Sequence, residues 1–331
     1  MHRLAVTAVV ERFAVAGSFV IARGATQHVD VVVATVGDGA HVGRGEATPV
    51  YYEGETAEGC IAAILDRAAS AAPLTRASLL ETMKPGAARN ALDCALWDLE
   101  AQRAGRSVAA LAGLPEQQAI ETAYTISVGA PEAMEAAARA AASRPLLKVK
   151  LDGRDDRAKI AAVRRGAPAA RLIADANESW GGLDIAAEAA ALAALGVEMI
   201  EQPVRAGAEE RLAGVASPVP LVADESCQSS ADLDRCIGRF QGINIKLDKA
   251  GGLTEAMRLA DAAAAAGLDV MIGCMLCTSL AVAPAALLAS RARWVDLDGP
   301  LLLAADRAGG FVFEGGRLAP PPVPIWGGQR Q

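Results

Sequence analysis

A regular series of short apolar runs constrains the fold of this chain more than any other feature of its sequence. Eight runs rich in apolar or β-branched residues are centred near positions 125, 148, 173, 199, 222, 244, 271 and 295, at intervals of 22 to 27 residues. Alanine-rich segments with helical spacing, such as "DIAAEAAALAALG" and "EAMRLADAAAAAG", fill most of the intervals. Strands that alternate with helices in this way are typical of repeated parallel βα units.

The number and the apolar character of these runs favour a closed sheet. Parallel strands covered on both faces are almost continuously apolar, and eight of them predict a barrel of the (β/α)8 type. An open doubly wound sheet is the alternative, but it usually has fewer strands and a glycine-rich phosphate turn. The chain is therefore expected to be an α/β protein built around a barrel.

The segments on either side of the repeat have a different character. About the first 50 residues alternate apolar and polar positions between turns, which predicts an antiparallel sheet. Residues from about 55 to 113 are helical, and "AARNALDCALWDLEAQRAG" predicts a helix that ends at Gly105. The tail "GGRLAPPPVPIWGGQRQ" lacks the pattern of a barrel helix. We therefore expect a capping domain of α+β type over 1–115, a catalytic barrel over 116–305 and a return of 306–331 to the capping domain.

Composition excludes several classes of partner. The net charge is −7 without a basic block, which argues against nucleic acid. Six cysteines are scattered without a disulfide framework and are expected to be reduced thiols. Glu11 and Arg12 interrupt the first apolar run, so no signal peptide is predicted, and no run reaches the roughly 18 apolar residues of a membrane span. The expected location is the cytoplasm, without membrane contact.

Three consecutive strands of the repeat end in an acid. They deliver Asp175 in "ADAN", Glu201 in "IEQP" and Asp224 in "ADES" to the carboxyl-terminal rim, where barrels of this kind place their active sites. Such acids can simply cap the following helices. Three that converge would repel one another unless a cation neutralised them, and an all-oxygen set suits Mg²⁺ or Mn²⁺. The sequence therefore predicts a divalent-metal site.

The placement of lysines predicts the second half of the site. Only six of the 32 basic residues are lysines, and histidine occurs only three times, always within the first 41 residues. Lys148 and Lys150 point to the same face of the second strand, since strand side chains alternate with period two. Lys246 lies on the sixth strand, opposite the second in an eight-stranded ring. Each lysine could merely pair with a carboxylate, but that does not explain a pair across the lumen.

Amines on opposite faces of one bound carbon suit a 1,1-proton transfer. One neutral lysine would remove the proton α to a carboxylate, and the opposite ammonium would return a proton from the other face. The enediolate charge would be stabilised by the metal. We expect burial and neighbouring cations to lower the pKa of the base toward neutrality.

The strand motifs "KVK", "DAN", "EQP", "ADES" and "NIK" resemble those of the enolase superfamily, muconate-lactonizing-enzyme subgroup, over essentially the whole chain. The resemblance implies a modified TIM barrel, (β/α)7β, whose N-terminal capping domain is completed by the C-terminal tail, and one Mg²⁺ or Mn²⁺ per subunit. It also implies that Lys150 is the base, that Lys148 contacts the substrate carboxylate and that Asn177 supports the metal site. The mandelate-racemase subgroup uses a histidine base, and the barrel has no histidine.

The eighth strand gives the best indication of the substrate. Asp296 and Asp298 in "VDLDGP" resemble the D-x-D pair that holds the substrate ammonium in dipeptide epimerases, and "AYTISV" implies Thr125 as a further contact. Cys274 and Leu276 in "GCMLCTS" fall where that family has substrate contacts, although the motif departs from its best-known forms. The Cys-x-x-Cys spacing there does not indicate redox chemistry, because nothing resembles a thioredoxin unit.

One residue of the capping domain completes the candidate set. Arg23 is either a surface residue or a partner for a glutamate side chain of the substrate. The predicted function is metal-dependent epimerisation of dipeptides of the L-Ala-D/L-Glu type. The alternatives are racemisation of an N-acyl amino acid such as N-acetylglutamate, and a non-catalytic barrel that binds a ligand. Elimination to o-succinylbenzoate and cycloisomerisation of muconate use similar lysines, but the acid pair is unsuited to those anions. The expected partner is a small molecule, and a homo-oligomer is possible.

Overall fold

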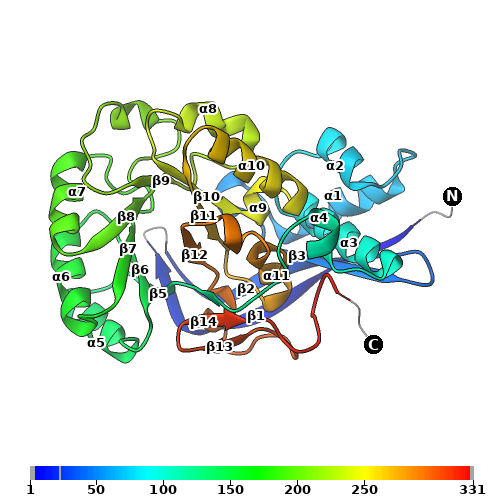
Figure 1. Cartoon of the computed structure of the whole chain (residues 1–331), viewed down its shortest axis with the longest axis horizontal. Coiled ribbons are helices and arrows are strands. Elements are labelled where there is room, and N and C mark those ends of the chain that lie inside the picture. Colours follow the sequence, from blue (N-terminus) through cyan, green and yellow to red (C-terminus); the bar gives the residue numbers. More distant parts are fainter. Residues whose placement is uncertain (1–3, 22–23, 329–331) are drawn as a thin grey trace.

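The chain folds into a barrel with a smaller domain packed against one end. The computed structural model describes residues 4–21 and 24–328, and the side chains of 17–21 and 25 are not described. Figure 1 shows the barrel on the left and centre, with α5, α6 and α7 along its outer side. The smaller domain lies on the right, and its long strands β1 and β2 extend beneath the barrel.

The N-terminal domain is an antiparallel sheet covered by helices, as the sequence predicted. Its strands β1 (Ala5–Ile21), β2 (Gly24–Gly37) and β3 (Val42–Ala47) pair in chain order. They are followed by the 3-10 turn η1 (Tyr51–Glu53) and the helices α1 (Ala57–Ala69), α2 (Arg76–Thr82), α3 (Ala87–Ala104) and α4 (Val108–Ala112). The predicted helix end is confirmed, because Gly105 adopts a left-handed conformation with φ 60°.

Strand β3 lies unusually close to α3. A Cβ atom added at Gly43 would be 2.1 Å from the carbonyl oxygen of Ala95, and one at Gly45 would be 2.2 Å from that of Ala91. Since only glycine permits this approach, β3 and α3 form one closely packed unit. The first residue after the strand, as shown below, reaches the candidate site.

Eight parallel strands form the barrel, as predicted from the eight apolar runs. They are β5 (Tyr124–Ile126), β6 (Leu146–Lys150), β7 (Arg171–Asp175), β8 (Val197–Glu201), β9 (Leu221–Ala223), β10 (Gly242–Lys246), β11 (Asp269–Gly273) and β12 (Trp294–Asp296), paired in that order. The backbone N–H of Ala123 donates to the carbonyl of Val295 at 2.8 Å. This bond joins the two ends of the sheet, so the ring is closed.

Seven crossovers connect the strands, and the fold is the predicted (β/α)7β barrel. The main crossover helices are α5 (Pro131–Ala140), α6 (Asp156–Gly166), α7 (Ile185–Ala194), α8 (Leu233–Cys236), α9 (Leu247–Ala250), α10 (Leu253–Ala265) and α11 (Ser279–Ala286), with short turns η3 (Ser230–Asp232) and η4 (Ala289–Arg291). Between β8 and β9 only the 3-10 turn η2 (Glu209–Leu212) forms. After β12 the chain forms the 3-10 turn η5 (Gly299–Leu302) instead of an eighth helix.

The alternation within the strands sorts side chains between the lumen and the helices. Leu147, Val149 and Leu151 belong to the main core between the sheet and its helices. One position out of phase, an apolar layer fills the lumen; it consists of Ala123, Leu146, Ile173, Met199, Val222, Met271 and Trp294. We call this layer the lumen floor. The barrel is therefore packed at its amino-terminal end and has no pore there.

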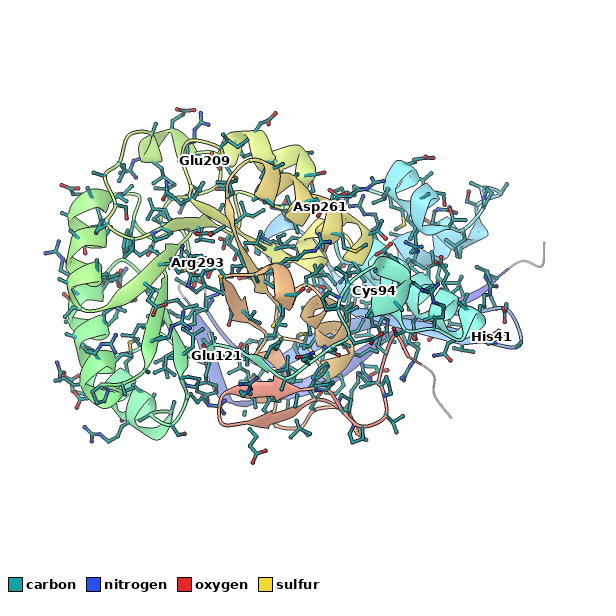
Figure 2. All side chains as sticks on the ribbon, viewed as in Figure 1. His41, Cys94, Glu121, Glu209, Asp261 and Arg293 are labelled. Carbon is teal, nitrogen blue, oxygen red and sulfur yellow. The ribbon has the colours of Figure 1, made fainter. Side chains whose placement is uncertain are left out.

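The C-terminal segment returns across both domains. Strands β13 (Val312–Glu314) and β14 (Arg317–Ala319) form a small sheet with β4 (Ile120–Glu121). Farther on, the indole N–H of Trp326 donates to the carbonyl of Cys94 on α3 at 3.0 Å; Cys94 is labelled in Figure 2. Gly327 bonds to Asp98 and Val108 of the capping domain. All six cysteines are free, and among residues 4–21 and 24–328 no helix is both long and apolar enough to cross a membrane.

Candidate active site

A charged layer lies directly above the lumen floor. On several strands, the residue two positions after a floor residue is charged and lies on the same lumenal face. In this way Lys148 follows Leu146, Asp175 follows Ile173 and Glu201 follows Met199. Asp224 follows Val222 and Asp296 follows Trp294 in the same way. We call this set, together with Lys150 and Lys246 above it, the polar layer. Side chains at i and i+2 share a face of a strand. On each of these strands the lumenal face therefore changes from an apolar side chain that packs the floor to a charged side chain in the candidate site.

Lys148 is the centre of the polar layer. Its ammonium nitrogen lies 2.6 Å from Glu201 Oε2, 2.7 Å from Asp296 Oδ2 and 3.2 Å from Asp175 Oδ2. The side chain is buried, with 1% of its surface exposed. One cation is thus shared by carboxylates from three strands.

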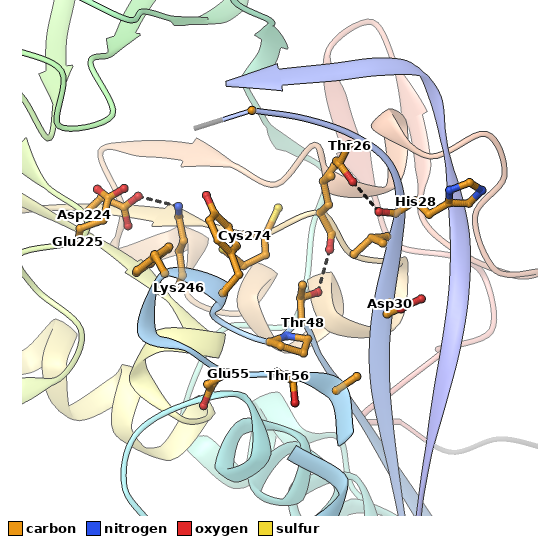
Figure 3. Close-up of a pocket in the computed structure, with 18 of the residues that line it drawn as sticks. Thr26, His28, Asp30, Thr48, Glu55, Thr56, Asp224, Glu225, Lys246 and Cys274 are labelled. Carbon is orange, nitrogen blue, oxygen red and sulfur yellow. Dashed lines mark hydrogen bonds and ion pairs between the residues drawn. The ribbon is translucent and has the colours of Figure 1, made fainter. Parts of the chain in front are cut away.

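The other two predicted lysines each pair with one of the carboxylates predicted as metal ligands. Lys150 Nζ donates to Asp175 Oδ2 at 2.7 Å, and Lys246 Nζ donates to Asp224 Oδ2 at 2.7 Å. Their strands, β6 and β10, are four places apart in the ring of eight, so the two amines approach from opposite sides as predicted. Figure 3 shows Lys246 and Asp224 joined at one side of the cavity.

Burial and pairing move the pKa values of these groups in opposite directions. Burial, helped by Asp175, raises the pKa of Glu201 to about 7. Burial also opposes ionisation of Asp175, but Lys150 and Lys148 outweigh it and hold its pKa below the usual range. For Lys246, burial favours the neutral amine, yet Asp224 raises the pKa above its ordinary value. The expectation of a lowered pKa concerned the base, whereas Lys246 is the opposite amine; it is held in its charged form because the carboxylates outweigh burial.

The residues present fit a hard divalent cation. Asp175 and Glu201 are register partners on neighbouring strands, and Asp224 directly follows the next strand. All three are buried carboxylates, the donor type that Mg²⁺ prefers. In or beside the polar layer, two buried oxygens receive no hydrogen bond from the residues that the structure describes: Asp296 Oδ1 and Asn244 Oδ1. This state is costly, and added positive charge would relieve it.

The described part of the chain does not hold the ligands in a finished cage. No three His, Cys, Asp or Glu side chains within residues 4–21 and 24–328 are grouped closely enough to bind a metal ion. Ammonium groups separate the carboxylates instead, with Lys150 on Asp175 and Lys246 on Asp224. A metal would therefore take the place of ammonium groups as the counter-charge of the carboxylates.

Three further residues of the site were not assigned from the sequence. Lys249 is fully buried, and its ammonium donates to Asp224 Oδ1 at 2.6 Å and to the carbonyl of Cys227 at 3.0 Å. Asn244 donates to Glu201 Oε1 at 2.7 Å. Gln202, at φ 36°, accepts the N–H of Asp224 at 2.7 Å. The scarcity of lysine could have identified Lys249, but no sequence signal distinguished Asn244.

A cavity of about 570 Å³ opens above the polar layer, between the barrel rim and the capping domain. Predicted residues that line it are Lys150, Lys246, Asp224, Asn177, Cys274 and Leu276. Capping-domain residues form the facing wall, including Thr26, His28, Thr48 and Glu55 (Figure 3). The volume suits a small molecule, because pockets for such ligands span roughly 300–1,000 Å³.

The remaining candidates lie beside the cavity or outside the described residues. Asp296 bonds to Lys148, and Asp298 accepts the backbone N–H of Thr125 at 2.7 Å. Burial, with Asp296 close by, raises the pKa of Asp298 to about 7. None of these four is among the residues that line the cavity in the part of the chain the structure describes. Arg23 lies outside the described residues.

Comparison with known proteins identifies the group to which this architecture belongs. Residues 3–113 match the model of the mandelate racemase / muconate lactonizing enzyme N-terminal domain, and residues 132–327 match the enolase C-terminal domain-like model. The L-Ala-D/L-Glu epimerase of Escherichia coli is 43% identical over 307 residues, which cover 91% of this chain and 94% of that protein. The N-acetyl-D-glutamate racemase of a Pseudoalteromonas species is 49% identical over 250 residues, covering 76% and 79%.

A solved structure resembles the whole chain. It is an enolase family member from Agrobacterium tumefaciens with homology to dipeptide epimerases, described with bound sodium and L-Ala-L-Glu. Its TM-score is 0.93 at 48% identity, and the match covers 98% of this chain and 100% of that one. The similarity therefore includes the capping domain, the barrel and the C-terminal return.

Proposed function

The chain belongs to the enolase superfamily, in its mandelate racemase / muconate lactonizing enzyme group, and from this premise we propose that it is an isomerase that epimerises dipeptides of the L-Ala-D/L-Glu type. The observation that carries the proposal is the pair Lys150 and Lys246, which lie on opposite strands and both line one cavity. Two amines on opposite faces of a bound carbon provide the two proton-transfer groups that inversion of one stereocentre requires.

The chain's own residues supply the proton transfers. Lys150 Nζ would take the α-proton from one face of the substrate, and Lys246 Nζ would deliver a proton from the other; the roles reverse for the opposite epimer. Asp175, Glu201 and Asp224 would hold one Mg²⁺ or Mn²⁺ per subunit, with Asn177 beside them. When bound, the ion supplies Lewis-acid stabilisation of the charge that develops on the substrate carboxylate.

Pairing with carboxylates explains how the lysines are controlled. Lys246 is held in its charged form by Asp224 as the site stands. A cation that engages Asp224 would weaken this pairing and favour release of the proton. With such an ion held by Asp175, Glu201 and Asp224, Lys246 would be released from its role as counter-charge of Asp224 and could act as a base.

The substrate contacts follow from the polar side chains near the cavity. Asp296 and Asp298 would receive the ammonium of a dipeptide, Lys148 and Thr125 lie beside them, and Cys274 and Leu276 form part of the wall. Arg23, in the sequence next to the first strand, is proposed to meet an acidic side chain. Residues 1–115 would cap the barrel of 116–305, and 306–331 would complete the cap.

Racemisation of an N-acyl amino acid is the second candidate, favoured by the 49% identity to the N-acetyl-D-glutamate racemase. Its substrate has no free ammonium, so Asp296 and Asp298 would have no cation to meet. The chemistry at the α-carbon would be the same. The two candidates therefore differ in the substrate and not in the roles of Lys150 and Lys246.

Incubation of the protein with Mg²⁺ in D₂O distinguishes these functions. A panel of dipeptides and N-acyl amino acids is scored by mass gain at the α-carbon and by chiral analysis. Exchange of L-Ala-D-Glu or L-Ala-L-Glu that is much faster than exchange of N-acetylglutamate supports the dipeptide epimerase. The opposite ranking supports the racemase. No metal-dependent exchange with any member would support a non-catalytic barrel. We propose that the protein works on such metabolites in the cytoplasm.

A further inference from the structure

The capping domain holds a wall of the cavity through two side chains that no part of the mechanism uses. Glu46 lies near the end of β3, and Thr48 follows two residues later. Both are buried, at 1% and 7% exposure. They reach the barrel loop after β11, which contains the cavity-lining residues Cys274 and Leu276.

Thr48 and Glu46 fix two points of this loop. The hydroxyl of Thr48 donates to the carbonyl of Leu276 at 2.8 Å, and Figure 3 shows this bond at the edge of the cavity. The carboxylate of Glu46 accepts the backbone N–H of Thr278 at 2.8 Å and is itself paired with Arg307 at 2.8 Å. Leu276 and Thr278 are therefore both hydrogen-bonded to the segment 46–48 of the capping domain.

Thr48 also contacts the segment that carries one of the reacting amines. Its backbone N–H donates to Asp248 Oδ1 at 2.9 Å. Asp248 lies on α9, the four-residue helix that begins directly after Lys246 and also carries Lys249. Thr48 thus bonds both to α9 and to the loop after β11, and it also lines the cavity.

The position of Thr48 is itself rigidly determined. Strand β3 approaches α3 so closely that Gly43 and Gly45 have no room for a Cβ atom. Helix α3 in turn bonds to the barrel, because Arg89 donates to the carbonyl of Ala250 at 2.6 Å and Asn90 donates to Asp248 at 3.0 Å. Thr48 is therefore attached to the closely packed unit of β3 and α3, and its position does not depend on a free loop.

We propose that Thr48 is a specificity-determining positioning residue: its hydroxyl holds the 274–278 wall at the spacing that selects the substrate side chain. This inference rests on the proposed function. A one-ångström displacement of a wall changes the fit of a side chain without moving the two lysines. Loss of the hydroxyl is therefore expected to change discrimination between substrates more than it changes proton transfer.

Thr48→Val tests this, because it removes the hydroxyl while keeping the volume and the N–H bond to Asp248. The matched control is Thr254→Val, which removes a hydroxyl from the same domain interface, where Thr254 bonds to Asp93 and Trp97 away from the cavity. We expect Thr48→Val to change the ratio of kcat/KM between L-Ala-L-Glu and L-Ala-L-Leu by roughly three- to tenfold, mainly through KM. Thr254→Val should leave this ratio unchanged even if it lowers Tm.

Hydrogen exchange supplies a readout that does not depend on turnover. In Thr48→Val, backbone amides of 274–278 should exchange roughly three- to tenfold faster, while the same peptide in Thr254→Val should match the wild type. An unchanged substrate ratio with unchanged exchange, or equal changes in both variants, would overturn the inference. If the wild type turns over no panel member, the proposed function fails, and the exchange comparison alone decides whether Thr48 holds the wall.

Discussion

The lumen floor and the polar layer differ by one step of the same strands, yet they have opposite physical character. The floor consists of apolar side chains that are 2% exposed or less. Above it, the polar layer pairs four carboxylates (Asp175, Glu201, Asp224, Asp296) with three amines (Lys148, Lys150, Lys246). The first layer gains stability from packing, whereas the second gains little net stability, because buried ion pairs barely compensate for desolvation.

The difference shows how the barrel separates stability from chemistry. Truncating a floor residue leaves a cavity and removes contacts, so it should change the free energy of unfolding. Changing a polar-layer residue should alter metal binding and turnover. This distinction would be wrong if a floor substitution mainly reduced turnover, or if a polar-layer substitution mainly changed the free energy of unfolding.

Removal of the metal should produce the largest effect, and it concerns the polar layer alone. Several kcal/mol of transition-state stabilisation are attributed to such an ion, so a chelator should reduce turnover by roughly a thousandfold or more. Added Mg²⁺ should restore activity and raise Tm, since it binds the native state. Full activity in the presence of chelator, with no Mg²⁺-dependent shift of Tm, would contradict the metal site.

Met199→Ala should destabilise the protein through the floor. Met199 is fully buried beneath Glu201, and we expect a loss of about 2–5 kcal/mol in the free energy of unfolding, measured by denaturant titration. Met257→Ala, on α10 at a partly buried position, is the matched control and should cost less. Below the melting transition, kcat should stay within a few-fold of the wild type. A large loss of kcat with unchanged stability would show that the layers are not separate.

Lys249→Met should weaken metal binding without touching the cavity. It removes the ammonium that fixes Asp224 but keeps most of the side-chain volume. Outer partners of ligands typically affect metal affinity 10- to 100-fold, so the Mg²⁺ concentration needed to raise Tm should increase by about that factor. Lys159→Met is the control, because this buried lysine pairs with Asp152 and Asp156 outside the lumen. If both variants needed the same Mg²⁺ concentration to raise Tm, Lys249 would have no role in metal binding.

A pH titration tests the buried carboxylate of Asp248, which has neutral donors and no ammonium partner among the contacts of the described residues. Asp248 accepts from Thr48 and Asn90, and burial raises its pKa to about 7. The native protein then holds this proton longer than the unfolded chain, so its contribution to stability is present below pH 4 and is lost as pH rises through 7. Asp248→Asn should reduce the fall in unfolding free energy across this window by up to about 1.4 kcal/mol per pH unit.

The control for this titration is a carboxylate on the surface. Asp261 is 71% exposed in its side chain and pairs with Arg291. Asp261→Asn should leave the slope between pH 4 and 7 nearly unchanged, because exposed pairs contribute little. The same slope in Asp248→Asn and in the wild type would show that Asp248 ionises freely in the folded protein.

The sequence predicted the architecture well because period-two alternation and the βα repeat are local patterns. They correctly placed the eight strands, the antiparallel capping sheet and the lumenal direction of Lys148 and Lys150. They missed the weak crossover between β8 and β9, where "RAGAEERLAG" forms only the turn η2. Gly207 and Gly214 both have positive φ, so a helix in that segment could not extend beyond them.

The electrostatics of the site could not be predicted in the same way. Whether burial or a partner controls a lysine depends on distances between strands far apart in sequence, as for Lys246 and Asp224. The roles of Asn244 and Thr48 also depend on such contacts. The sequence therefore predicted which lysines face the lumen but not the network of contacts that holds them.

Stereospecific proton exchange tests the central claim most directly. Lys150→Ala and Lys246→Ala are each incubated with Mg²⁺ in D₂O and with either epimer of the dipeptide that the wild type prefers. Each variant should lose epimerisation by roughly 10²–10⁴-fold and should exchange the α-proton of only one epimer, with opposite preferences in the two variants. If Lys150→Ala still exchanged the α-proton of both epimers, the two-base mechanism across the polar layer would be wrong.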